Sequence, residues 1–184
     1  MENTPALTPL LTAVAAVAGV VAKSLWDLYW KRWETLADAS RKTRLEFLER
    51  QLSSFYWPIY LYLQKNNVVW DQLVNGKAFD DSIRRQVNSQ LHLTFFRQNH
   101  DTLVKLIESN IHIAQPDAEF ESILLEFVRH VTLYSALRDL GHENIDPIAF
   151  NVPWPNKFFA AVEQRLASTQ KEYEGLLGWT SGKK

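Results

Sequence analysis

The feature that most constrains this chain is an uncharged run near its N-terminus. Residues 3–22 contain no Asp, Glu, Lys, Arg or His, and residues 10–22 are almost wholly apolar. A helix of this length spans roughly 30 Å, which is the hydrocarbon thickness of a bilayer. The run therefore predicts a transmembrane helix, followed by one soluble domain.

The residues after the run favour a membrane anchor and give it an orientation. Residues 23–44 carry six basic and three acidic side chains, whereas Glu2 is the only charged side chain before the run. The positive-inside rule then places the N-terminus outside and the domain in the cytoplasm, as a single-pass protein. Aromatic residues recur at three- and four-residue steps, which predicts a belt at headgroup depth: Trp26, Tyr29, Trp30 and Trp33.

Two alternatives to an uncleaved anchor stay open. A cleaved signal peptide would have a basic segment before the apolar run, and this chain has Glu2 there with no Lys or Arg. A buried core helix is the other alternative, because the run is rich in alanine and only moderately hydrophobic.

The same run contains small residues spaced four apart, which allow close helix packing in lipid. Ala15 pairs with Gly19, and Ala18 pairs with Ala22. Together with Trp26 and Trp30 of the belt, these residues are the predicted membrane and homo-oligomer interface: Ala15, Ala18, Gly19, Ala22, Trp26 and Trp30.

Composition limits the classes of function. The 184 residues include no cysteine, which excludes disulfides, thiolate nucleophiles and Cys-ligated zinc. Lys and Arg number 20 against 21 Asp and Glu, and general nucleic-acid binding would require a basic excess. The 10 Phe, 7 Trp and 6 Tyr provide enough apolar side chains for a core.

Apolar residues at helical spacing and the lack of alternating runs predict an all-α fold. We expect a membrane segment over residues 1–30, a stalk helix over 31–54 and a cytosolic helical bundle over 55–184, with Pro58 kinking or starting a helix. Residues 144–156 contain three prolines and predict an irregular strap anchored by Trp154. The expected helix ends are N-caps at Asp80, Asn99 and Asp117 and a C-terminal glycine at Gly141.

Polar residues on one side of the predicted helix at 117–140 give the first candidate site. His130, Tyr134 and Arg138 lie near Phe127 and Val131 at about 100° per residue. A charged Arg on an apolar face is costly unless it is paired. Either Arg138 pairs with a carboxylate or caps the C-terminal carbonyl groups of its own helix, or the three residues form a pocket for a small anionic ligand such as a phosphate.

The second candidate site is the segment Arg97, Asn99 and His100, at a predicted helix N-terminus. Free N–H groups and the helix dipole favour an anion there. The alternative is capping by Asn99 with a half-buried His100. Three histidines, His100, His112 and His130, lack the spacing of a metal motif, so no metal or cofactor is predicted.

No catalytic motif is present: the chain has no GxSxG, P-loop or GxGxxG sequence. An enzyme that uses His100, Tyr134 and Arg138 on a phosphoester is a hypothesis that we do not favour. Acid–base residues alone do not make a site without a nucleophile or a metal.

Five features together resemble a group of small bacterial single-span membrane proteins with an uncharacterised helical cytosolic domain. These are the apolar N-terminal run and the segments FYWPIYLYLQ, NHDTLVKLIESNIHIA, FVRHVTLYSALR and DPIAFNVPWPNKFF. In architecture alone the chain is also similar to membrane effectors of prokaryotic antiviral defence, including a type III CRISPR ancillary protein that senses cyclic oligoadenylate. The second resemblance implies a sensor or effector that acts as an oligomer on the membrane.

These observations leave two main hypotheses for function. In the first, the helical domain is a membrane-anchored sensor or effector, and the span assembles the chain into a homo-oligomer. In the second, the chain is a membrane-tethered scaffold that docks a cytosolic protein.

Overall fold

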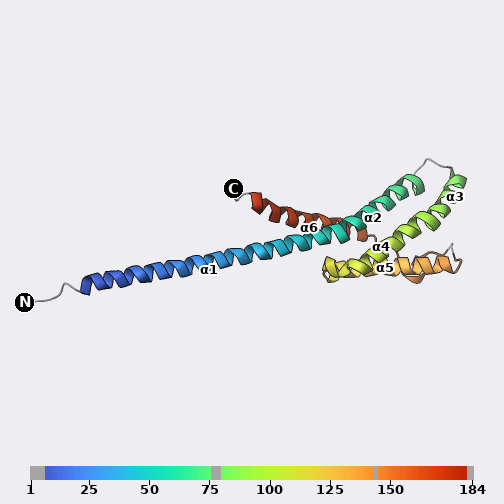
Figure 1. Ribbon diagram of the computed structural model, residues 1–184. Coiled ribbons are helices and arrows are strands. Elements are labelled where there is room, and N and C mark those ends of the chain that lie inside the picture. The colour runs from blue at the N-terminus through green and yellow to red at the C-terminus, as the bar shows by residue number, and fades with distance from the viewer. Residues whose placement is uncertain (1–6, 76–79, 143–144, 182–184) are drawn as a thin grey trace, which may run out of the picture. The chain divides into compact units, whose positions relative to one another are not determined.

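The computed structural model describes residues 7–75, 80–142 and 145–181, and every regular element in these ranges is a helix (Figure 1). The prediction of an all-α fold with a helical bundle is therefore confirmed. The chain divides into two compact units, Met1–Arg44 and Leu45–Lys184.

The first unit consists of the N-terminal part of α1 (Leu7–Gln51), an unbroken helix of 45 residues. Every side chain from residue 18 to residue 40 is exposed. A Cβ atom added at Gly19 would meet no other atom within 4 Å. Ala18 and Ala22 are exposed as well, and the side chain of Ala15 lies outside the described residues. The predicted oligomer interface therefore stays a prediction.

The predicted transmembrane helix is not supported. None of the helices in the described part of the chain combines the length and the apolar character that crossing a bilayer requires. Residues 3–6 of the predicted span lie outside the described residues, and residues 7–22 form the beginning of α1.

The second unit begins at Leu45, earlier than residue 55, where we expected the helical domain to start. The last turns of α1 are part of its core, because Leu48, Gln51 and Leu52 are buried. The Gln51 side-chain amide donates to the carbonyl oxygens of Ile113 at 2.8 Å and Ala114 at 3.2 Å. The C-terminal part of the predicted stalk therefore packs as a core helix.

Pro58 interrupts the helical hydrogen bonds without ending the helix. The π-helical turn η1 (Leu52–Tyr56) connects α1 directly to α2 (Trp57–Val69), which continues into η2 (Trp70–Val74). The backbone N–H of Trp57 donates to the carbonyl of Leu52, five residues earlier. Because proline has no N–H and crowds the preceding turn, the wider π turn accommodates Pro58 within a continuous helix.

The next three elements also form one continuous helix: α3 (Asp81–Leu91), the π turn η3 (His92–Phe96) and α4 (Arg97–Ala114). Asp80 caps α3 as predicted and accepts from the N–H groups of Ser82 and Ile83 at 3.0 and 2.9 Å. The predicted cap at Asn99 is wrong, because α4 follows η3 without a break and Asn99 lies within this continuous helix.

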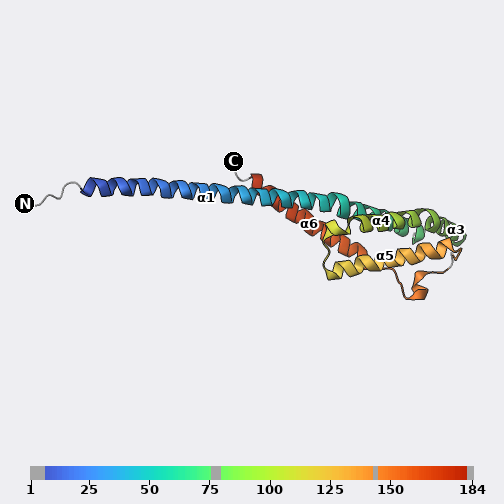
Figure 2. The same ribbon diagram turned by 60° about the horizontal axis from the view of Figure 1, so that its bottom comes forward.

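The domain is completed by α5 (Ala118–Asp139), the short 3₁₀ helix η4 (Pro147–Phe150) and α6 (Phe158–Ser181). Gly141, at φ +79°, follows the end of α5 as predicted. Four helices pack in a closed ring, in which α2 contacts α4 and α6, and α5 contacts both α4 and α6 (Figures 1 and 2). The core has these fully buried side chains: Phe55, Ile59, Leu103, Leu124, Phe127, Phe158 and Val162.

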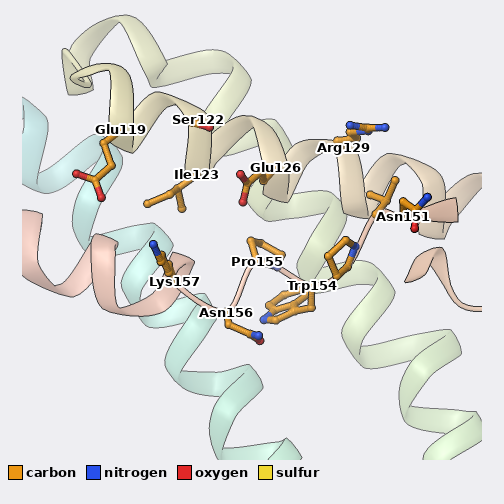
Figure 3. A pocket seen from close by; sticks show the side chains of 12 residues that line it. Glu119, Ser122, Ile123, Glu126, Arg129, Asn151, Trp154, Pro155, Asn156 and Lys157 are labelled. Atoms are coloured by element: carbon orange, nitrogen blue, oxygen red, sulfur yellow. The ribbon is translucent and has the colours of Figure 1, made fainter. Parts of the chain in front are cut away.

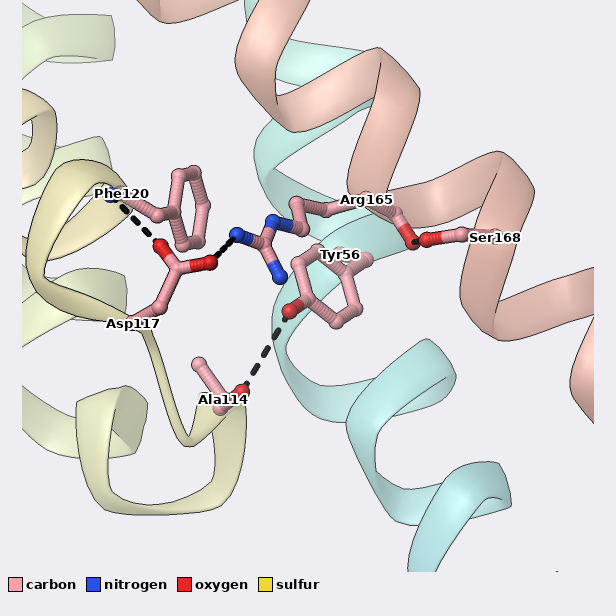
Figure 4. Close-up of polar contacts among 6 residues, drawn as sticks. All are labelled: Tyr56, Ala114, Asp117, Phe120, Arg165 and Ser168. Atoms are coloured by element: carbon pink, nitrogen blue, oxygen red, sulfur yellow. Dashed lines mark hydrogen bonds and ion pairs between the residues drawn. The ribbon is translucent and has the colours of Figure 1, made fainter.

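Asp117 connects the start of α5 to α6 (Figure 4). Its carboxylate accepts from the Phe120 N–H at 3.0 Å, which confirms the predicted N-cap, and also forms an ion pair with Arg165. The Phe120 N–H and then the Arg165 guanidinium lower the pKa of this carboxyl group. One exposed carboxylate thus fixes both the beginning of a helix and its contact with the next.

Candidate functional site

The first predicted site is occupied by the protein's own polar groups. His130 Nδ1 lies 2.9 Å from the carbonyl oxygen of Val152, and the Tyr134 hydroxyl donates to the carbonyl of His92 at 3.1 Å. Arg138 donates to the carbonyl oxygens of His142 at 2.8 Å and Ile145 at 3.0 Å. The three side chains therefore hold η3 and the segment after α5 rather than lining an empty pocket.

Arg138 caps carbonyl groups, but not those at the C-terminal end of its own helix. Its guanidinium lies over the Tyr134 ring, 4.5 Å from the centroid. The carbonyl groups that it binds belong to residues directly after α5, not to the last turn of the helix itself. The charge is thus balanced by two carbonyl dipoles and an aromatic face.

The second predicted site does not have the geometry that we expected. Arg97, Asn99 and His100 lie inside a continuous helix, so the helix N-terminus on which the predicted anion site depends is absent here. Arg97 pairs with Asp139 at the end of α5. The Asn99 side chain donates to Asn66 Oδ1 at 2.8 Å.

His100 belongs instead to a buried ring cluster that also contains His130 and Tyr134. The centroid of its ring lies 5.2 Å from that of Trp154, 6.0 Å from Tyr134 and 6.1 Å from Phe127. We call His92, His100, His130, Tyr134 and Trp154 the histidine–tryptophan cluster. It unites residues from both predicted sites, but Arg138 reaches it only through Tyr134.

The electrostatics of this cluster are unusual at His100. The side chain is 9% exposed, and its Nδ1 atom has no hydrogen-bond partner among the described residues. Burial lowers the pKa of His100 to about 4, and the neighbouring His130 and His92 act in the same direction. Burial also lowers the pKa of His92. The imidazole of His100 is therefore neutral at physiological pH.

A groove of about 630 Å³ lies between α5 and the strap, residues 145–156 (Figure 3). Trp154 and Pro155 form an apolar wall, and the indole of Trp154 is 38% exposed. The polar side chains that line the groove come mainly from α5 and from the end of the strap: Glu119, Ser122, Glu126, Arg129, Asn151, Asn156 and Lys157.

This groove suits a segment of polypeptide better than a polyanion. Glu119 and Glu126 lie two helical turns apart on the side of α5 that faces the strap, and the Lys157 side chain points toward α5 (Figure 3). An indole beside prolines, with charges of both signs around it, offers apolar contact and paired polar contacts. No His, Cys or Asp is among the described residues that line the groove.

Sequence reasoning missed the groove residues of α5. Glu119 and Glu126 have the pattern of a solvated helix face, and no signal in the sequence distinguishes them. In the described ranges, no three potential ligands lie close enough together to hold a metal. Comparisons with protein-family models, curated proteins and solved structures found no match. The site is therefore interpreted from its own geometry.

Proposed function

We propose that this chain is a membrane-attached docking module. In this proposal α1 binds a bilayer surface, and the helical domain presents the groove between α5 and the strap to a cytosolic protein. The observation that carries the proposal is the set of exposed aromatic side chains on α1.

No other residue in the described part of the chain buries these aromatic side chains. Trp26, Tyr29, Trp30 and Trp33 are 58–63% exposed, and the rings of Trp26 and Trp30 stack on each other with centroids 6.4 Å apart. Amphipathic rings of this kind partition to the membrane interface. Further exposed apolar side chains widen the same face: Leu25, Leu28 and Leu36.

Several charged side chains of this part of α1 lie in a stripe beside the aromatic face. At about 100° per residue this stripe contains Lys23, Asp27, Lys31 and Asp38, and Asp27 lies four residues from both lysines. In a helix that lies in the plane of the interface, apolar side chains enter the headgroup region and charged side chains stay in water. From the apolar side, the long side chain of Arg32 reaches the lipid phosphates.

The domain supports docking rather than small-ligand sensing. Arg138, which we expected to meet an anionic ligand, is bonded to two carbonyl groups, whereas the groove beside the strap is open. Sensor or effector activity, a role in antiviral defence, the single-pass topology and the homo-oligomer stay predictions from the sequence.

Removing the four aromatic side chains of α1 should weaken membrane binding strongly. We expect Trp26, Tyr29, Trp30 and Trp33, all changed to alanine, to lower the partition coefficient of the full-length protein at least about tenfold, because several apolar rings leave the interface. Flotation of the purified protein with lipid vesicles on a density gradient measures this change.

The matched control carries four alanines at exposed polar positions of the same helix: Thr35, Asp38, Ser40 and Thr43. This variant should float like the unaltered protein. Equal flotation of the aromatic variant and the control would show that these rings do not attach the chain to lipid.

A further inference from the structure

The Trp154 end of the strap, residues 151–155, is held against histidines from two helices. The Trp154 ring lies tilted against that of His100 of α4 and meets the ring of His130 of α5 edge-on, with centroids 5.2 and 5.3 Å apart. We propose that protonation of His100 releases this end of the strap, so that mild acid opens the wall of the groove. This inference rests on the helical domain alone and does not depend on membrane attachment.

Aromatic rings surround His100 on several sides. Phe96, Phe127, Tyr134 and Trp154 all lie within 5.2–6.2 Å of it, measured between ring centroids. Of these, Trp154 also lines the groove, so it separates His100 from solvent. An imidazolium ion at this position has lost its water and gains no hydrogen bond through Nδ1 while Trp154 stays in place.

None of the described carboxylates lies against the His100 ring as a counter-ion, because the pKa of His100 responds to burial and to the neighbouring His130 and His92. On its own helix, Arg97 pairs with Asp139, and Asp101 accepts from the Ser135 hydroxyl at 3.0 Å. The Asp146 carboxylate of the strap accepts from the Ile148 N–H at 2.9 Å. The remaining titratable groups that face the cluster are not carboxylates: His92 of η3, and His130, Tyr134 and Arg138 of α5.

Acid therefore favours the state in which water reaches His100. With the strap closed, the pKa of His100 is about 4, and with Trp154 lifted it returns toward the ordinary value of 6.5. Because the pKa of His100 is lower in the closed state, the open state binds more protons at pH values between these two pKa values. The linkage relation gives an increase of about 30-fold in the open fraction between pH 7.5 and pH 5.0.

The other attachments of this segment permit a local opening. The bond between His130 and the Val152 carbonyl holds the segment at one point, with Nδ1–H as the donor that a carbonyl requires. Asn151, at φ +56°, ends η4 and is the first residue of the segment. The Trp154 end can thus move while Arg138 keeps its bond to Ile145 at the other end of the strap.

Thiol labelling of the full-length protein tests the release, because the natural chain has no cysteine. Val152→Cys places one thiol in the strap, and Val162→Cys places one in the core of α6. Val152 is 6% exposed and Val162 is 0% exposed. Labelling with a pyridyl disulfide, which reacts in mild acid, is normalised to the exposed variant Ser168→Cys at each pH. We expect the labelling rate of the strap thiol to rise about 30-fold from pH 7.5 to pH 5.0, while the rate of the core thiol stays constant.

A second substitution assigns the effect to His100. In the His100→Phe background, which keeps an aromatic ring but does not titrate, the acid-induced rise at the strap thiol should disappear. An unchanged rate at the strap thiol would overturn the proposal, as would an equal rise at the core thiol, which indicates unfolding of the whole domain. If His100→Phe does not fold, the two cysteine variants that retain His100 still decide between release and no release.

Discussion

Replacing Phe127 with alanine is expected to lower the free energy of unfolding of the helical domain by about 3–5 kcal/mol. Phe127 is 0% exposed, and its ring stacks on that of Phe158 with centroids 4.3 Å apart. It also meets the Trp154 ring edge-on at 5.6 Å. One side chain thus joins α5, α6 and the strap, and no neighbour can fill its volume without moving. Urea unfolding of the full-length protein, followed by circular dichroism, measures the loss.

Phe127→Leu is the matched control, because it keeps most of the apolar volume and removes the ring. It should cost clearly less than Phe127→Ala. If the alanine variant were as stable as the unaltered protein, Phe127 would not lie at the junction of the three elements as the structure places it.

Replacing Arg138 with methionine is expected to lower the free energy of unfolding by about 1–3 kcal/mol, the range for lost hydrogen bonds to a charged group. The substitution keeps an apolar stem but leaves the carbonyl groups of His142 and Ile145 without their donor. It also removes the cation from the Tyr134 ring. The same urea titration measures this effect.

Arg138→Lys should recover only part of this loss, because an ammonium group lacks the planar fork that serves two carbonyl groups while stacking on a ring. A methionine variant of unchanged stability that fails to bind a phosphate-containing ligand would contradict the structural role. That result would restore the ligand site predicted from the sequence.

Much of the fold follows from local patterns in the sequence. The apolar stripes indicate the helices, and Asp80, Asp117 and Gly141 mark helix ends by side-chain chemistry and backbone conformation that depend on few neighbours. Pro58 and Asn99 are harder to interpret. Both are signals of a helix end, but π turns next to them keep the helices continuous, and the packing that stabilises a π turn is not visible in a linear sequence.

The candidate site is predictable only in part. The sequence predicts Trp154 as the anchor of the strap, and this residue packs between His100 and His130. The sequence also indicates that Arg138 is a charge in need of partners, but its carbonyl partners come from an irregular segment whose path no periodicity describes. Glu119 and Glu126 line the groove only because the strap passes beside them.

The most direct test of the central claim, that α1 lies in a membrane interface, is a spin-label scan of residues 20–38. Single cysteines carry a nitroxide each in the otherwise cysteine-free full-length chain, bound to lipid vesicles. The ratio of accessibility to oxygen over accessibility to a water-soluble nickel complex reports immersion in lipid. We predict a ratio that oscillates with the helical period, high at Trp26, Tyr29 and Trp33 and low at Lys23 and Lys31. A ratio that is low at every position would contradict attachment to the membrane, and one that changes steadily along the helix would contradict an in-plane helix.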